Sequence, residues 1–289
     1  MYEVALLSLA SEAEADQVRT PVRACADALA AAGARAEPVT ATSDQEVDAV
    51  LARVADGARL VVAAASDAQV RAVVRRMVRR WAPPPSRRPE DLPEGRTLPD
   101  LPPLAILSLD PVGADLAGRL GLPREPAAVA EAVLGDRVQR LDLFRHDGAG
   151  GVTLDGALLG SSDADGRVVL WRARVEVDDA LLSDGDEPLL AAVVANGGGY
   201  VRPDGLPLVA DPDPADGRVT AAVALPVRQR WRRRVRVEVR RARGRAVTVR
   251  PAEDVACLDD GVAGTLTRAR TWWVEPGAWA VYTGPERAS

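Results

Sequence analysis

The stretch Val193–Gly217, VVANGGGYVRPDGLPLVADPDPADG, carries the most informative pattern in the chain. It begins inside an apolar run, Leu189–Ala195, that predicts a buried strand. The single asparagine of the chain, Asn196, and a glycine run follow directly, and the stretch ends in an acidic turn at Asp216-Gly217. Another strand is predicted at Arg218–Leu225. This succession of strand, glycine-rich loop, acidic turn and strand decides the fold expected for the second half of the chain.

Composition narrows the chemistry that the chain can perform. Its 289 residues, 47% hydrophobic and 27% charged, suit one large domain or two moderate ones. All 37 basic residues are arginines, so mechanisms that need a lysine Schiff base, a lysine general base or a Walker lysine are excluded. Cys25 and Cys257 have neither a disulfide framework nor zinc-ligand spacing, and both are expected to be small buried hydrophobic residues.

The first half alternates strand and helix patterns. Strands are expected at Val4–Leu9, Ala36–Ala41, Leu60–Ala64 and Leu104–Leu109. The helices between them are expected from Ser11 to about Ala32, with a kink or break at Pro21, from Ser43 to Ala55, and at Asp67–Trp81. Such alternation predicts an α/β domain with a mainly parallel sheet over residues 1–135.

From Arg137 onward the pattern becomes strand-like. The expected strands are Val168–Val177, Arg218–Leu225, Arg234–Val239, Ala246–Arg250, Thr265–Val274 and Trp279–Thr283. The segment 147–166 is rich in Gly and Asp and is expected to be a surface loop. With no long helix pattern, residues 136–289 predict a second domain, an all-β sandwich.

The order of these elements, and the Asn196-to-Gly217 motif in particular, resembles the diacylglycerol kinase and sphingosine kinase-like family of lipid kinases. The family pattern is "aNG…GGg…aPdA…dDG", and Leu141-Asp142-Leu143 is similar to the "iDlg" strand that opens its second domain. The resemblance covers nearly the whole chain. It implies transfer of the γ-phosphoryl group of ATP, with magnesium, to a lipid hydroxyl.

The nucleotide-facing motifs depart from the family pattern. The family loop GGDGT matches Ala65-Ser66-Asp67-Ala68-Gln69, and its glycines let backbone amides approach phosphates. The resemblance implies that Asp67, with Ser66 beside it, serves the nucleotide and magnesium; alternatively, either residue is only a helix N-cap. The family element "PLGTxNDfA" matches Asp110 to Ala117, where Asp115 is kept but Val112 and Ala114 replace hydrogen-bonding residues. The early family turn "NPxSG" is missing after the first strand.

The second-domain motifs are better preserved. The resemblance implies that Asp213 and Asp216 hold a structural magnesium ion through oxygen ligands, although the same residues suit a solvated Asp-Pro turn. Asp259-Asp260-Gly261-Val262 is similar to the family's "vDGE", which implies Asp260 as the base that takes the lipid hydroxyl proton. Val262 replaces the family glutamate, and a plain Asp-Gly turn between strands is the alternative for Asp260.

Two other features leave alternatives open. The segment Arg228–Arg245 contains ten arginines and could bind an anionic membrane surface, or be a strand with a charged outer face. Trp231 is its only aromatic residue, so no nucleic acid is expected as a partner. His146, the only histidine, is expected at the surface.

These observations together predict a diverged relative of the lipid kinases, impaired or inactive in ATP-dependent phosphorylation. Binding of a lipid or nucleotide-like molecule in the cleft between the domains remains open, as does a homodimer. The alternatives are an active ATP- and magnesium-dependent lipid kinase and a non-catalytic protein that binds a partner or a membrane surface. Because neither a signal-peptide pattern nor a run of about 18 apolar residues occurs, a cytoplasmic location is expected, with peripheral attachment to the inner membrane face as a variant.

Overall fold

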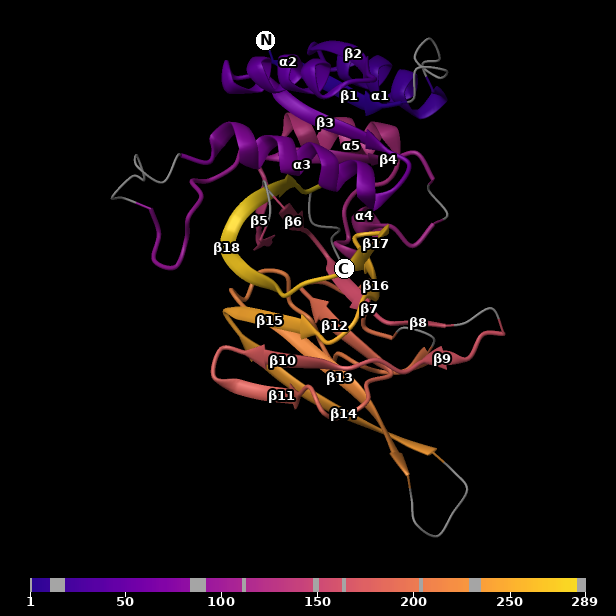
Figure 1. Ribbon diagram of the computed structural model, residues 1–289. Helices are drawn as coiled ribbons and strands as arrows, with labels where there is room; N and C mark the ends of the chain where they lie inside the picture. Colours follow the sequence, from indigo (N-terminus) through magenta and orange to yellow (C-terminus); the bar gives the residue numbers. More distant parts are fainter. Residues whose placement is uncertain are drawn as a thin grey trace. The chain divides into compact units, whose positions relative to one another are not determined.

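The structure is a computed structural model that describes residues 2–10, 19–83, 92–110, 113–147, 151–162, 165–202, 205–228 and 235–284. It divides into two compact units (Figure 1). Unit 1 comprises Met1–Leu141 and Gly277–Ser289, and unit 2 comprises Asp142–Pro276. The C-terminal segment thus belongs with the first unit, whereas the sequence pattern had placed it in the second domain.

Unit 1 contains a sheet with helices on both faces. Its elements are β1 (Glu3–Leu9), α1 (Thr20–Ala31), β2 (Arg35–Ala41), α2 (Asp44–Ala55), β3 (Arg59–Ala64), α3 (Asp67–Trp81), β4 (Leu104–Ser108), α4 (Leu116–Arg119) and α5 (Pro126–Leu134). Strand β1 pairs in parallel with β2 and β3, and β3 pairs in parallel with β4. The carboxyl ends of β3 and β4 therefore lie at the same edge, which places the two loops that follow them side by side.

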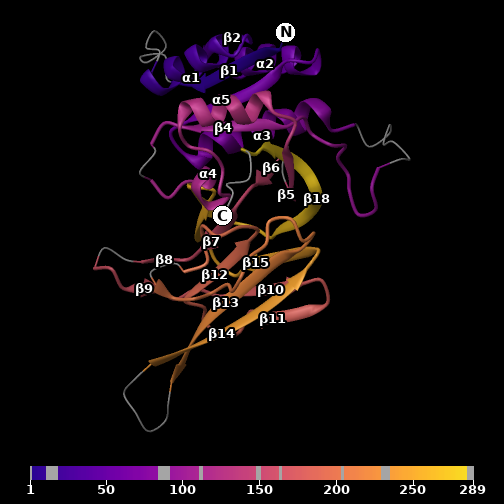
Figure 2. The ribbon, with the colours of Figure 1, turned by 180° about the vertical axis from the view of Figure 1, so that it is seen from behind.

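The helices of unit 1 bury alternate residues of these strands. Helices α1 and α5 pack against each other and against Val4, Leu6 and Val61, while α2 and α3 cover the opposite face (Figures 1 and 2). Helix α1 begins at Thr20 with Pro21 in its first turn. Pro21 does not kink the helix, because proline lacks an N–H that the first turn does not need, and so it stands at the helix start. The alternative, a break at Pro21, stays a prediction. The expected helix start at Ser11 lies outside the described residues.

Unit 2 is built from strands. They are β6 (Gly151–Thr153), β7 (Gly156–Leu159), β8 (Ser161–Ser162), β9 (Val168–Val169), β10 (Ala173–Val177), β11 (Ala180–Asp184), β12 (Ala191–Ala195), β13 (Val219–Arg228), β14 (Val235–Gly244), β15 (Ala246–Pro251), β16 (Val255–Asp259) and β17 (Val262–Leu266). Two longer strands, β5 (Val138–His146) and β18 (Arg270–Tyr282), begin in one unit and end in the other. One sheet has the order β14-β13-β12-β7-β16-β17, and β11, β10, β15 and β18 are neighbours in the other.

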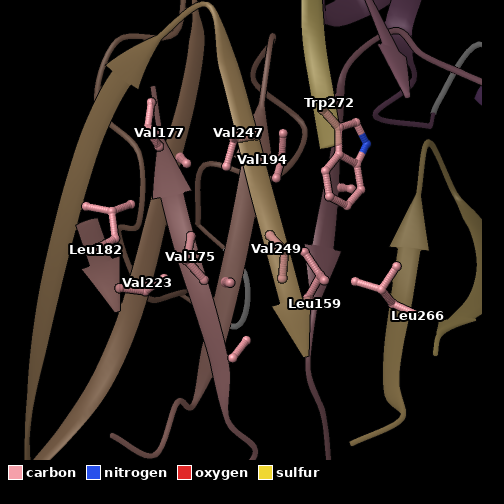
Figure 3. Packing of buried hydrophobic residues seen from close by; sticks show 14 of the residues in the cluster. Leu159, Val175, Val177, Leu182, Val194, Val223, Val247, Val249, Leu266 and Trp272 are labelled. Carbon is pink, nitrogen blue, oxygen red and sulfur yellow. The ribbon is translucent and has the colours of Figure 1, made fainter. Parts of the chain in front are cut away.

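Buried residues from both sheets of unit 2 form one hydrophobic cluster. Figure 3 shows Val175 and Val249 from one sheet facing Leu159 and Val194 from the other, with Trp272 beside them. Trp272 is fully buried and is among the largest side chains in the core. Because aromatic residues are only 3% of the chain, this core is assembled mainly from Val, Leu and Ala.

Two expectations from the sequence differ from the structure of unit 2. The described part of the segment 147–166 is not a surface loop, because it contains β6 and β7, and the turn residues Leu154 and Asp155 between them are buried. The separate strands expected at Thr265–Val274 and Trp279–Thr283 are largely one strand, β18, which passes through Pro276-Gly277 without a break. Proline and glycine indicate a turn in a sequence, yet both occur in strands at positions that need no hydrogen bond or that bend.

Candidate functional site

The loop between β3 and α3 carries Ser66 and Asp67. Ser66 occupies the N-cap position of α3, but its side chain makes no capping hydrogen bond. The Asp67 carboxylate instead accepts a hydrogen bond from the backbone N–H of Leu116 at 2.8 Å and one from the Arg119 guanidinium at 2.5 Å. Both oxygens of Asp67 are thus engaged by α4, so this aspartate joins the β3–α3 loop to the helix that follows β4.

Gln69 closes the other side of the same loop. Its side-chain oxygen accepts the backbone N–H of Ala65 at 2.7 Å, and its amide nitrogen donates to the carbonyl of Leu9 at 3.2 Å. A phosphate held at such a loop needs free backbone N–H groups as donors. The Gln69 carboxamide therefore occupies the donor at Ala65 and ties the loop to the end of β1.

Asp115 stabilises the loop that follows β4. It is the N-cap of α4, accepting the N–H of Gly118 at 2.9 Å, and it also accepts the Ser108 hydroxyl at 2.5 Å and the Arg124 guanidinium at 3.1 Å. Arg124 donates further to the carbonyl of Gly113 at 2.9 Å. The Asp115 carboxylate is thus the centre of a network that holds this loop in one conformation.

Ser66, Asp67 and Asp115 come together around a very small space. The cavity that they line with Leu116 and Ala117 measures about 10 Å³. A space of that size accommodates about one water molecule. Of the sequence-predicted nucleotide residues, the structure therefore brings all three together, but around a space too small for a phosphate.

The acidic turn in unit 2 is held by its own carboxylates. Asp213 accepts the N–H of Ala215 at 3.0 Å, and Asp216 accepts the N–H of Arg218 at 2.9 Å and forms an ion pair with Arg243. These are local turns in which an aspartate bonds the backbone two residues onward. The buried Asp142 carboxylate accepts the N–H of Gly217 at 2.6 Å, which fixes the end of the turn.

The two carboxylates implied as magnesium ligands, Asp213 and Asp216, already have partners in and beside the turn. Within the described ranges, no group of three or more His, Cys, Asp or Glu side chains is placed to hold a metal ion. Magnesium needs only one or two carboxylates, with carbonyl oxygens and waters as its other ligands, so a magnesium ion at this turn stays a prediction. In the structure Asp213 and Asp216 serve the turn itself, and the Arg243 guanidinium neutralises Asp216.

Asp260 lies at the tip of the hairpin formed by β16 and β17. Asp259 pairs with Val262, which leaves a two-residue loop of Asp260 and Gly261 with φ values of 46° and 78°. Two consecutive residues with positive φ define a type I′ turn, for which Asp-Gly is a preferred pair. The backbone of Asp260 is thus explained by the hairpin alone.

The Asp260 side chain points into unit 2 and is only 1% exposed. Its carboxylate accepts three backbone N–H groups, from Leu154 at 2.7 Å, Asp155 at 2.9 Å and Gly156 at 3.1 Å. These donors belong to the turn between β6 and β7, more than a hundred residues away in sequence. The carboxylate therefore fastens one hairpin to another, and a substrate hydroxyl could reach it only if this contact opened.

The glycine run after Asn196 packs around the same place. The Tyr200 hydroxyl accepts the N–H of Gly261 at 2.8 Å, and the Asp155 carboxylate accepts the N–H of Gly199 at 3.2 Å. Burial raises the pKa of the Tyr200 phenol, with the nearby carboxylates adding to the effect. Asn196 donates to the carbonyls of Asp142 and Leu154, both at 2.8 Å. Asn196, Gly199 and Tyr200 of the Val193–Gly217 stretch thus hold the two turns that meet at Asp260.

His146 is not a surface residue, contrary to the expectation. Its side chain is 10% exposed, and its ring lies 6.1 Å from that of Trp272. The nearest carboxylate is Asp259, 3.7 Å from Nε2, and Asp259 also accepts the Thr153 hydroxyl at 2.7 Å. A strand end before a glycine-rich segment suggested exposure, but β6 returns alongside β5 and covers the imidazole.

The arginines of Arg228–Arg245 that lie in the described range are largely engaged within unit 2. Arg240 pairs with Glu187 at 2.5 Å and Glu238 at 2.8 Å, and these bonds raise the pKa of its guanidinium. Arg241 donates to the carbonyls of Pro207 and Leu208, both at 2.6 Å. Residues 229–234 lie outside the described residues. Separately, no helix in the part of the chain that the structure describes is both long and apolar enough to cross a membrane.

The sequence did not indicate that Thr153, Asp155 and Tyr200 contact the turn Asp259-Asp260-Gly261. The only available signal was the tripeptide Leu154-Asp155-Gly156, which resembles a tight turn between apolar residues. That signal does not reveal a partner a hundred residues away.

The two units together, an α/β unit followed by a β-rich unit, have the fold of diacylglycerol kinase-like proteins. Three solved structures from Bacillus anthracis str. Sterne, described as diacylglycerol kinases or as candidates for that activity, superpose with TM-scores of 0.64, 0.68 and 0.65. Their sequence identities are 13%, 13% and 15%, and each comparison covers 98% of this chain and 98% of the other. At such low identity the likeness shows the fold. No protein-family model and no curated protein matches the chain.

Proposed function

We propose that this chain is a diacylglycerol kinase-like protein in which ATP-dependent lipid phosphorylation is impaired or absent. The proposal includes the finer description of the fold, a mainly parallel sheet followed by a β-sandwich. The parallel pairing of β1, β2, β3 and β4 and the core shared by two sheets in unit 2 support that description.

The observation that carries the proposal is the closed loop between β3 and α3. Gln69 takes the Ala65 N–H, Arg119 takes Asp67, and the cavity beside them measures about 10 Å³. Phosphoryl transfer depends on positioning the phosphates and compensating their charge. A loop in which the Ala65 N–H and the Asp67 carboxylate already have partners offers less for either task.

The burial and hydrogen bonds of Asp260, the base implied by the resemblance, also support impaired phosphorylation. An active kinase would need Asp260 to meet a lipid hydroxyl within hydrogen-bond distance. Its carboxylate is buried and accepts three N–H groups, so reaching it requires opening the contact between two hairpins. Because the Asp67, Asp216 and Asp260 carboxylates already have partners, the proposal extends to weak or absent binding of ATP and magnesium, which the family resemblance implies.

A transfer assay tests the proposal. The protein is incubated with radiolabelled Mg·ATP and diacylglycerol in mixed micelles, and label in the lipid phase is counted against a protein-free reaction. We expect no incorporation above that background. Turnover above it that is lost in Asp260→Asn, with folding checked by circular dichroism, would establish the alternative of an active kinase.

A second candidate function is attachment to an anionic membrane surface through Arg228–Arg245, in a cytoplasmic protein. The exposed Arg236, on a ribbon of two strands that extends from unit 2, favours it. Sedimentation with anionic vesicles at low and high salt tests it, because surface attraction weakens as salt increases. Failure to sediment at low salt would exclude it.

A further inference from the structure

A pocket at the base of the β13–β14 ribbon collects three arginines. Arg218, Arg243 and Arg245 line a space of about 460 Å³ in unit 2. The ribbon is visible in both views of the molecule (Figures 1 and 2), and its two strands pair from Val219 and Gly244 onward. The residues that line the pocket adjoin these Val219 and Gly244 ends. Arg243 belongs to β14, and Arg218 and Arg245 lie directly outside the ends of β13 and β14.

The register of the ribbon explains why the arginines face one another. Val219 pairs with Gly244, so Arg218 and Arg245 stand next to that pair on opposite strands. Arg243 and Arg245 are two residues apart and so point to the same face of the strand. Like charges directly across a strand pair destabilise it unless an opposite charge is shared between them.

The carboxylates around the pocket do not balance these charges. Asp216 pairs with Arg243, and the Asp178 carboxylate accepts the backbone N–H groups of Arg245 and Ala246, at 2.9 Å and 3.0 Å. Three guanidinium groups therefore face two carboxylates, which leaves one positive charge. Among the described residues, the Arg218 and Arg245 guanidinium groups have no carboxylate partner.

Gly244 keeps the pocket in this form. A β-carbon at that position would overlap the Asp178 carboxylate and a methyl group of Val177. Only glycine therefore allows the Asp178 side chain to turn back onto the backbone of the β14–β15 turn. The Asp178 carboxylate is therefore engaged by the backbone N–H groups of Arg245 and Ala246, and it forms no ion pair with a described arginine of the pocket.

We propose that this pocket binds a phosphate group, either free in solution or carried by a lipid headgroup. Guanidinium forks match the oxygen spacing of phosphate and donate charge-assisted hydrogen bonds to it. A phosphate between Arg218 and Arg245 neutralises the excess charge and separates the two guanidinium groups. The site belongs to unit 2 alone and is independent of any kinase activity.

Calorimetric titration with inorganic phosphate and with pyrophosphate tests the site. Unmodified protein is compared with the double variant Arg218→Gln/Arg245→Gln, and Arg236→Gln is the matched control. The Arg236→Gln substitution removes one positive charge from the same ribbon. Arg236 lies eight residues from Gly244, about 26 Å along the strand at about 3.3 Å per residue. All three positions are exposed, so folding should change by no more than about 0.5 kcal/mol.

We expect saturable binding that weakens at least about tenfold, or 1.4 kcal/mol, in the double variant and is unchanged in Arg236→Gln. Sedimentation with phosphatidylcholine vesicles, with and without phosphatidate, identifies the source of the phosphate. Phosphatidate-dependent sedimentation that the double variant loses indicates a lipid headgroup, and binding of the free anions alone indicates a soluble phosphate. The proposal is overturned if Arg236→Gln loses as much phosphate or pyrophosphate affinity in calorimetry as the double variant does. It is also overturned by absence of binding both to the vesicles and to either anion at about 10 mM.

Discussion

Replacing Asp260 by glycine tests whether its carboxylate supports the structure of unit 2. The substitution removes the three hydrogen bonds to Leu154, Asp155 and Gly156 but keeps a residue that tolerates the φ of 46°. Each buried N–H left without a partner costs about 1 to 2 kcal/mol when water can partly replace the acceptor. Three of them predict a loss of about 3 to 6 kcal/mol in the free energy of unfolding.

Asp211→Gly is the matched control for this substitution. Asp211 also has a positive φ, 44°, but it is exposed, and none of the described residues forms a hydrogen bond with its side chain. The change there should lie within about 1 kcal/mol, since only backbone entropy and relieved strain are involved. Urea unfolding followed by tryptophan fluorescence gives both values, and hydrogen exchange of a peptide spanning 154–156 gives the local effect. Equal stability of the two variants would refute the structural role of Asp260.

Three further substitutions test other parts of the structure. Ser43→Ala removes the capping box that Ser43 forms with Glu46 at the start of α2, and should lower the thermal midpoint through a loss of about 1 kcal/mol. Burial raises the pKa of the Cys25 thiol from 9.0 to about 11, so the stability that the protonated thiol contributes is present below pH 9 and is lost as the pH rises toward 11. Thermal scans of Cys25→Ala should show a smaller decline in stability over this pH range. An unchanged decline would contradict the burial of the thiol. Gly151→Ala places a methyl group against the His146 ring and should cost about 1 to 3 kcal/mol in urea unfolding, with no loss indicating that the ring lies elsewhere.

The sequence predicts a strand or helix correctly where a local pattern of residues determines it. The strands β1 to β4 and the helices α2 and α3 follow from apolar periodicity and helix-capping residues, and their bounds agree with the expected ranges within one residue. The Asp260-Gly261 turn could also be read locally, because Asp-Gly between two strand patterns is a strong hairpin signal. The diacylglycerol kinase-like fold was recognisable from the Asn196-to-Gly217 motif and the order of the elements.

The partners of the acidic residues could not be read from the sequence. Asp67 was assigned to a nucleotide by resemblance, but its partner Arg119 lies 52 residues away on a one-turn helix that no pattern indicated. Asp260 meets backbone groups 104 to 106 residues distant, and backbone N–H donors leave no trace in residue type. The segment 147–166 was misread because strands of three or four residues are too short to show alternation among glycines and aspartates.

The most direct test of the central claim is calorimetric titration of Mg·ATP into the unmodified protein and into a variant with the loop restored. The restored loop carries Ala65→Gly, Ser66→Gly, Ala68→Gly and Gln69→Thr, which removes the Gln69 side chain from the Ala65 N–H. The closed loop predicts no saturable binding to the unmodified protein at about 1 mM nucleotide, and measurable binding only when the loop is restored. Micromolar binding of Mg·ATP to the unmodified protein would contradict it.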